Sequence, residues 1–245
     1  MMSSGYSLIL ATDLDGTFLG GSDGDRAEFY DYLQRHRDRV LLVFVTGRDL
    51  DLVRQLYDEA GFPTPDYIIG DVGTSVTCGK TFQPLAEVQG WISDIWQNAN
   101  DLVKALLNGE PGLSLQPIEP RYRVSYYYDP EVLQPSTLKK LDEAGFDAVL
   151  SADRFLDVMP KGVSKGPTLL KTLAALNLDL NNAVVAGDTL NDLSLFETGL
   201  KGVAVGNAEP KLIDRLRDMS NVYLSQKPGA AGIWEGLNYH SKTLS

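Results

Sequence analysis

Several residue types that mark whole classes of protein are scarce in this sequence of 245 residues. It has one cysteine, Cys78, so an intrachain disulfide is excluded and we expect a reducing, cytoplasmic environment. With only two histidines, a histidine-rich zinc site is not expected. No apolar run approaches the roughly 18 residues of a membrane span, and residues 1–10 lack the basic stretch of a signal peptide. We therefore expect no membrane partner.

The charge balance of the chain is strongly acidic. It has 33 acidic and 22 basic residues, which gives a formal net charge of −11. Such a charge repels nucleic acid, so we expect no nucleic-acid partner. It would also repel a phosphorylated substrate, unless a metal ion and a few lysines or arginines reverse the sign locally. Cys78 lacks the nearby following arginine that a cysteine phosphatase needs, so phosphate chemistry here would have to use carboxylates.

Apolar runs alternate with helical patterns at both ends of the chain. Residues 6–12 and 40–45 have the length and aliphatic content of buried parallel strands, and residues 25–39 between them have a helical pattern. This alternation of strands and helices is typical of a doubly wound parallel sheet. We predict that residues 1–82 and 160–245 together form an α/β catalytic core.

The middle of the chain follows a different pattern. Residues 89–107 show one long helical pattern that is followed by two extended segments. A second helical pattern over residues 130–144 is again followed by two extended segments. The order is α-β-β-α-β-β, which suits a small α+β unit with a mostly antiparallel sheet. We predict that residues 83–159 form a cap domain inserted into the core.

Three of the predicted core strands are followed by polar side chains, those of Asp13, Thr46 and Asp188. In open α/β sheets, ligands bind outside the carboxyl ends of the strands, so these groups are expected to meet in one crevice. Asp15 and Asp192 add carboxylates nearby. Crowded carboxylates suit a nucleophile and an acid/base group with Mg²⁺ between them. Each motif alone also fits a purely structural role. Asp13 and Asp15 could lie in a solvated turn, and Asp188 could cap a helix.

Cationic and hydrogen-bonding groups that could hold a phosphate also occur at suitable places. Lys165 precedes a predicted helix and could neutralise a transferring phosphoryl group, although Lys161 is a rival four residues away. The Thr46 hydroxyl and the Gly47 N–H could donate to phosphate oxygens, but Thr46 could also simply end its strand. Arg48 could face solvent or the cap.

Four motifs occur in order along the chain: D-L-D-G-T (13–17), T-G-R (46–48), S-K-G (164–166) and G-D-T-L-N-D (187–192). Together they resemble those of the haloacid dehalogenase-like phosphatases. The insertion point and the pattern of the predicted cap resemble the larger cap class of that superfamily. Within it, segments such as R-V-S-Y (123–126) and G-L-K-G-V-A-V-G-N-A-E-P (199–210) are similar to sucrose-phosphate and mannosylfructose-phosphate phosphatases.

This resemblance implies roles for the matching residues. Asp13 would attack phosphorus and become an aspartyl phosphate, and Asp15 would protonate the leaving oxygen and then activate water. Thr46 and Lys165 would hold phosphoryl oxygens. The implied Mg²⁺ ligands are Asp13, the backbone carbonyl of Asp15, and Asp188, with support from Asp192. The implied substrate-binding residues of the core are Leu14, Thr46, Gly47, Lys165 and Asn191.

The resemblance also implies an activity. We expect a Mg²⁺-dependent phosphomonoester hydrolase that converts sucrose 6-phosphate into sucrose and phosphate. The alternatives are a phosphatase for mannosylfructose phosphate, glucosylglycerol phosphate or mannosyl-phosphoglycerate, and a phosphomutase on the same fold. A non-catalytic binding module would be expected to have lost Asp13, Asp15 or Lys165. A glycosyltransferase of the same pathway is a candidate partner.

Substrate choice is expected to lie in the cap, because the core motifs handle only the phosphoryl group. In the extended segment 121–129 (RYRVSYYYD), strand alternation would place Arg121, Arg123, Ser125 and Tyr127 on one face and the other tyrosines on the opposite face. One face should look into the crevice, although the tyrosines could instead only pack the cap helices. The candidate sugar-binding residues of the cap are Arg123, Tyr126 and Arg154.

Overall fold

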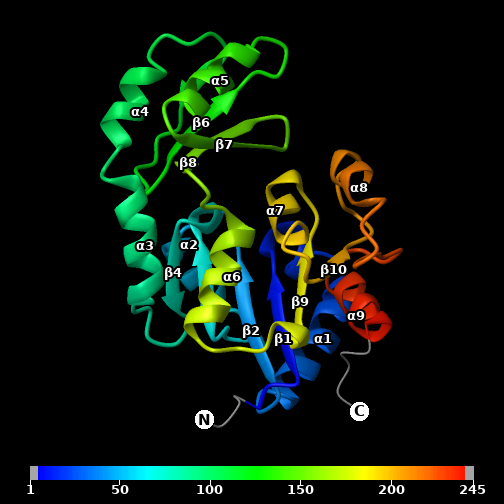
Figure 1. Cartoon of the computed structure of the whole chain (residues 1–245). Coiled ribbons are helices and arrows are strands. Elements are labelled where there is room, and N and C mark those ends of the chain that lie inside the picture. The colour runs from blue at the N-terminus through cyan, green and yellow to red at the C-terminus, as the bar shows by residue number, and fades with distance from the viewer. Residues whose placement is uncertain (1–4, 241–245) are drawn as a thin grey trace.

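The computed structural model describes residues 5–240, and within them a seven-stranded sheet forms the larger part of the molecule (Figure 1). The strand order is β11-β10-β9-β1-β2-β3-β4, and every described pair is parallel except β3 with β4. This confirms the predicted doubly wound parallel sheet. The strands are β1 (Leu8–Thr12), β2 (Val40–Val45), β3 (Tyr67–Gly70), β4 (Ser75–Cys78), β9 (Ala183–Gly187), β10 (Lys201–Ala204) and β11 (Val222–Leu224).

Helices cover both faces of this sheet. Successive residues of β1 point to opposite faces, so Leu10 packs with α1 and α9 while Ile9 packs with α6. Burial on both faces explains why the central strands are apolar throughout. Among the described residues, no helix is both long and apolar enough to cross a membrane. The helices of this part are α1 (Asp23–Arg35), α2 (Leu50–Gln55), α6 (Lys165–Ala175), α7 (Leu193–Phe196), α8 (Pro210–Leu216) and α9 (Gly229–Tyr239).

A smaller, antiparallel sheet lies above the carboxyl ends of the core strands (Figure 1). Its strand order is β5-β6-β8-β7, and Trp96, Leu141 and Leu156 belong to the apolar cluster that packs its helices against it. The predicted α+β cap with the order α-β-β-α-β-β is therefore present. Its elements are α4 (Asn100–Leu106), β5 (Leu113–Leu115), β6 (Val124–Tyr128), α5 (Pro135–Glu143), β7 (Phe146–Ser151) and β8 (Phe155–Pro160).

The single helical pattern expected over residues 89–107 is broken into two helices, α3 (Ala86–Trp96) and α4. Gln97 and Asn98 between them have left-handed backbone angles, with φ of 49° and 58°, which end the first helix. The break has a packing reason, because Val88 and Ile92 of α3 pack in the core cluster whereas α4 packs only in the cap cluster. Helix α3 thus connects the two parts, and the predicted domain boundary at residue 83 stays a prediction.

Candidate active site

The site begins at the end of β1, the strand in the middle of the core sheet. Thr12 is paired with Phe44 of β2 on one side and with Ala186 of β9 on the other. The next residue, Asp13, continues this pairing through a hydrogen bond of 2.9 Å from its backbone N–H to the Ala186 carbonyl. The register therefore brings the residues that follow β1, β2 and β9 to one edge of the sheet, as the sequence predicted.

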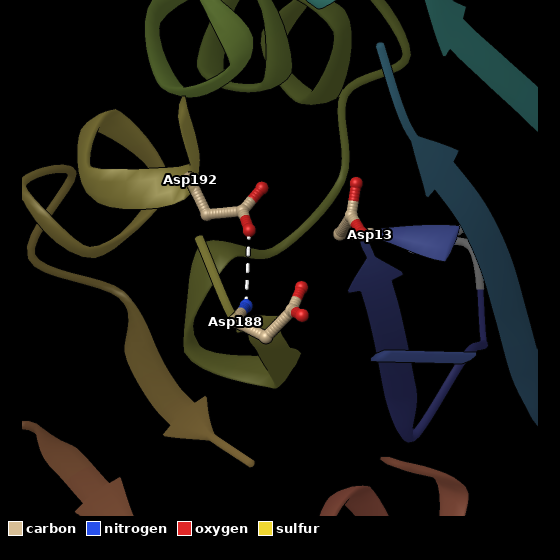
Figure 2. Close-up of side chains that lie close together, drawn as sticks. All are labelled: Asp13, Asp188 and Asp192. Atoms are coloured by element: carbon tan, nitrogen blue, oxygen red, sulfur yellow. Dashed lines mark hydrogen bonds between the residues drawn. The ribbon is translucent and has the colours of Figure 1, made fainter. Parts of the chain in front are cut away.

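Three carboxylates meet at this edge. Asp13, Asp188 and Asp192 are all buried, and one oxygen of each lies within 4.8 Å of the others. Figure 2 shows the Asp188 and Asp192 side chains turned toward Asp13. Burial, together with the nearby Asp192 carboxylate, raises the pKa of Asp188 to about 7, and burial also raises the pKa of Asp13. A set of hard oxygen donors that repel one another fits a divalent cation such as Mg²⁺.

Lys165 supplies the positive charge among these carboxylates. Its fully buried Nζ donates to Oδ1 of Asp13 at 2.7 Å, of Asp192 at 2.6 Å and of Asn191 at 2.8 Å. Burial alone would lower the pKa of Lys165, but the two carboxylates raise it above its usual value, so the ammonium stays charged. The rival Lys161 is exposed and pairs with two carboxylates of the cap, Asp142 and Asp147. The structure therefore brings Lys165 into the cluster and leaves Lys161 outside it.

Two tight turns hold the carboxylates in place. Gly16 has a left-handed backbone with φ of 77°, and a Cβ at this position would lie 2.1 Å from Oδ2 of Asp188. The next residue, Thr17, donates its hydroxyl to Oδ1 of Asp188 at 2.8 Å. Oδ2 of Asp192 accepts the backbone N–H groups of Asp188 and Thr189, each at 3.0 Å. Asp192 thus caps its own helical turn with one oxygen while the other faces Lys165.

The remaining core residues expected in the site lie around this cluster. Thr46 is fully buried, and its hydroxyl accepts the Arg48 backbone N–H at 3.2 Å. Gly47 and Asn191 line the same cleft as Asp13. The Leu14 side chain is buried in the apolar core, so only its backbone is left to contact a substrate.

Asp15 points away from the other carboxylates. Its side chain is 62% exposed, and it accepts two hydrogen bonds from Arg48, from Nε at 2.9 Å and from Nη2 at 2.6 Å. This contact raises the pKa of the Arg48 guanidinium. Asp15 therefore contributes no carboxylate to the buried cluster and lines the cleft instead. Its backbone carbonyl as a metal ligand and its acid/base role stay predictions.

A cavity of about 430 Å³ separates the buried cluster from the cap. The core side of its lining includes Asp13, Asp15, Gly47, Arg48 and Asn191. The cap side includes Gln116, Ile118, Arg123, Phe155 and Asp157. Its walls combine charged, amide and apolar groups, a mixture that suits a sugar ring with its hydroxyls and C–H faces. A larger groove of about 790 Å³ lies between α5 and α8 but contains none of the clustered carboxylates.

Arg123, predicted from the sequence, lies at the boundary between cap and core. Its Nη1 donates to Ser125 and to Asp157, both at 2.5 Å, and its Nη2 donates to Asp71 of the core at 3.1 Å. Burial raises the pKa of Asp71, and Arg123 partly offsets that effect. Arg154 is exposed, and its guanidinium lies 5.1 Å from the centre of the Tyr127 ring.

The structure does not bring Tyr126 into the cleft, which corrects its expected role in binding the sugar. Its side chain is 5% exposed and packs in the apolar cluster of the cap. The reason is the alternation of β6, which places Arg123 and Ser125 on the cleft side and Tyr126 on the opposite side.

Sequence reasoning missed several residues of the cleft and its boundary, among them the polar side chains of Asp71, Gln116 and Asp157. A signal existed for Asp157, because it is the single charged residue in the otherwise apolar strand F-L-D-V-M-P. A buried charge in a strand is rare unless it is paired, so this aspartate predicts a cationic partner on a neighbouring strand. Asp71 begins a short 3-10 helix (Asp71–Gly73) and Gln116 directly follows β5, and neither segment has such a pattern.

Comparison with known proteins identifies the family of this chain. Residues 6–241 match the profile of the sucrose-6F-phosphate phosphohydrolase family. The chain belongs to this family. Mannosylfructose-phosphate phosphatase of Agrobacterium fabrum is 34% identical over 94% of the chain and 96% of its own length. The sucrose-phosphatase of Synechocystis sp. PCC6803, solved in complex with sucrose and phosphate, superposes with a TM-score of 0.87 at 27% identity, covering 96% of this chain and 98% of that one.

Some relatives are longer than this chain. The glucosylglycerol-phosphate synthase of Pseudomonas anguilliseptica is 39% identical over 94% of the chain, which spans only 30% of the synthase. The chain spans 60% of tobacco sucrose-phosphatase 1. A haloacid dehalogenase-like hydrolase of Bacillus subtilis, with a TM-score of 0.69 at 18% identity, shares the fold. The resemblance to haloacid dehalogenase-like phosphatases, and to this phosphatase family within them, is therefore confirmed.

Proposed function

We propose that the protein is a Mg²⁺-dependent phosphomonoester hydrolase for a glycosyl phosphate, with sucrose 6-phosphate as the first substrate to test. The observation that carries this proposal is the environment of Asp13, a buried carboxylate that pairs with Lys165 and lies beside two further aspartates. Asp13 lines a cleft, and polar side chains of the cap line the same cleft. The relatives named for sucrose phosphate and mannosylfructose phosphate support a phosphorylated sugar.

The chemistry would proceed in two steps at Asp13. In the first, an Asp13 oxygen bonds to phosphorus, the bond from phosphorus to the sugar oxygen breaks, and Asp15 gives its proton to that oxygen. In the second, Asp15 takes a proton from water, the water oxygen bonds to phosphorus, and the bond to Asp13 breaks. Lys165 and Thr46 would hold the phosphoryl oxygens in both steps.

Asp13, Asp188 and the Asp15 carbonyl would hold the metal ion, with Asp192 in support. A bound Mg²⁺ would supply positive charge that offsets the carboxylates and the phosphate. Asp15 lines the cleft in which the sugar would bind, and its side chain is 62% exposed. The position of Asp15 therefore agrees with its proposed role as the proton carrier.

The test is phosphate release from sucrose 6-phosphate, mannosylfructose phosphate and glucosylglycerol phosphate in the presence of Mg²⁺. We expect release from at least one of them, and its complete loss in Asp13→Asn, because an amide is a poor nucleophile. Phosphate release by purified Asp13→Asn would contradict the covalent mechanism. Transfer of the phosphoryl group to another sugar hydroxyl, without free phosphate, would identify a phosphomutase instead.

We further propose that the protein acts in the cytoplasm after a glycosyltransferase, because a glycosyl phosphate forms when a sugar is transferred to a phosphorylated acceptor. The match to one part of the longer glucosylglycerol-phosphate synthase supports such a pairing. Cell fractionation tests the location. Copurification of the tagged protein with glycosyltransferase activity tests the partner.

A further inference from the structure

Arg123 is a buried arginine held between two carboxylates. Its side chain is 7% exposed, and it pairs with Asp157 of the neighbouring cap strand and with Asp71 of the core. The three side chains together carry one excess negative charge. Arg123 and Asp157 both line the cleft from the cap, whereas Asp13 lines it from the core. The end of the cleft that would hold the sugar is therefore anionic rather than cationic, although an arginine stands in it.

The other charges near this end do not change that balance. Arg48 donates two hydrogen bonds to Asp15, whose negative charge offsets the positive charge of the guanidinium while Asp15 is ionised. Asp49 lines the cleft and adds a further negative charge. Arg154 is exposed and lies over the rings of Tyr127 and Phe155, so water screens its charge. A carboxylate on the substrate would find no uncompensated buried cation here.

Arg123 nevertheless has a hydrogen-bond donor left over. Its Nε is buried and has no acceptor among residues 5–240, the described part of the chain. A buried donor without a partner is unfavourable, so an acceptor on a bound ligand would be favoured there. A hydroxyl oxygen can accept this bond without adding charge, whereas a carboxylate would bring a third negative charge to Arg123.

The core holds Asp71 firmly in its position. Asp71 and Val72 have left-handed backbone angles, with φ of 51° and 58°, which is rare for a β-branched residue such as valine. Their N–H groups donate to the carbonyls of Arg48 at 2.9 Å and Thr46 at 3.0 Å. These hydrogen bonds fix the backbone of Asp71, whose carboxylate pairs with Arg123, to the segment that contains Thr46, a predicted phosphate-binding residue. Such unusual backbone concentrates at functional sites.

We propose that Asp71 and Asp157, by neutralising Arg123, are specificity-determining residues that admit uncharged glycosyl groups and exclude substrates with a carboxylate near the phosphate ester. The proposal rests on the proposed function and narrows its substrate class. It excludes mannosyl-phosphoglycerate while keeping the phosphates of disaccharides and of glucosylglycerol.

The test uses two substrates that differ in a single group. In 2-O-glucosylglycerol 3-phosphate one carbon carries a hydroxymethyl group, and in 2-O-glucosyl-3-phosphoglycerate the same carbon carries a carboxylate. We expect kcat/KM for the carboxylate to be lower by about 100-fold, since like charges at close range cost several kcal/mol. Equal values for the two substrates would overturn the proposal.

The variant Asp71→Asn keeps a hydrogen-bond acceptor for Arg123 and removes one negative charge. We expect it to raise the kcat/KM ratio of carboxylate to neutral substrate about tenfold, the effect of removing one of the repelling charges. Asp157→Asn removes the other charge and should change the ratio in the same direction. The control is Asp94→Asn, which removes an exposed charge from α3 and should leave the ratio unchanged.

Two outcomes separate failure of this proposal from failure of the proposed function. An unchanged ratio in both Asp71→Asn and Asp157→Asn would mean that these aspartates only support the structure, and the proposal would be wrong. A thermal unfolding scan shows whether either variant is folded. Failure of the wild-type protein to release phosphate from any sugar phosphate or from an aryl phosphate would contradict the proposed function itself.

Discussion

At the scale of single residues, the main feature is an excess of negative charge in a buried space. Asp13, Asp188 and Asp192 carry three negative charges when ionised, and Lys165 offers one positive charge in return. Burial raises the pKa of Asp13 and Asp188, which means that the ionised cluster is unfavourable by itself. A divalent cation would balance the charges that Lys165 leaves over.

The first prediction follows from this balance. Phosphate release should disappear when a chelator removes divalent metal, and added Mg²⁺ should restore it. Ca²⁺ should restore little, because it prefers more ligands at longer distances than in-line phosphoryl transfer requires. Phosphate release and thermal unfolding should be measured on the same samples. Full activity after metal analysis has shown the protein to be metal-free would exclude the metal from the reaction.

The second prediction concerns Asp15, which the structure holds outside the buried cluster. Asp15→Asn should lower kcat by about 10²–10⁴-fold, the usual effect of losing general acid–base catalysis. Because the carboxylate of Asp15 is 62% exposed and exposed ion pairs add little stability, the variant should keep the thermal stability of the wild type. If kcat stays the same while KM rises, Asp15 binds the substrate and carries no proton.

Sequence reasoning did best with residues that lie at the ends of strands. Asp13, Thr46 and Asp188 were predicted because parallel strands end at a common edge, and that rule needs no knowledge of packing. The cap was harder. Alternation correctly separated Arg123 from Tyr126, but it could not say which face of β6 turns toward the cleft, because that depends on how the cap packs on the core.

At the scale of elements, the turn after β1 is tightly constrained at Gly16. Gly16→Ala should reduce activity strongly, because the new Cβ would lie 2.1 Å from an Asp188 oxygen and displace it. It should also cost about 1–2 kcal/mol of stability, since alanine is strained in a left-handed conformation. Chemical denaturation and phosphate release measure the two effects.

A matched control for this substitution exists in α1. Gly24 is exposed, and a Cβ there would meet only the Ser22 side-chain oxygen, at 3.9 Å. Gly24→Ala should therefore leave activity unchanged and stabilise the protein by about 0.5–1 kcal/mol. Equal behaviour of the two variants would mean that the backbone at Gly16 can relax.

The break between α3 and α4 could not be predicted from the sequence. Apolar spacing over residues 89–107 correctly predicted helix, yet the pattern is the same whether a helix packs on one partner or on two. The chain changes partner at Gln97 and Asn98, where α3 leaves the core and α4 enters the cap. Neither residue is a glycine or a proline, so no strong breaker signal was present.

At the scale of the whole molecule, ion pairs between residues far apart in the sequence join the cap to the core. Arg123 pairs with Asp71 beside the cleft, and Lys211 of α8 pairs with Asp153 in the turn between β7 and β8. The first is buried, and both partners of the second are more than half exposed. Both must break for the cap to move fully away from the core.

The fourth prediction tests the outer pair. Lys211→Met should shift the unfolding midpoint by less than about 4 °C, because exposed ion pairs add little stability. It should increase hydrogen exchange in the turn at residues 152–154, which would lose its tie to the core. Mass spectrometry of exchanged peptides measures this effect. Unchanged exchange would mean that the turn is held by the rest of the cap.

The place of β1 in the sheet also has a consequence for how the chain is made. β1 lies between β2 and β9, yet β9 is separated from it by the entire cap. During translation, β1 can pair with β2 early, but its other edge stays open until residue 187 has left the ribosome, which takes on the order of ten seconds. Through that time an apolar strand edge is available to other chains. We expect the nascent protein to depend on chaperones that cover such edges, and a ribosome-bound chain that ends before residue 183 to aggregate when it is released.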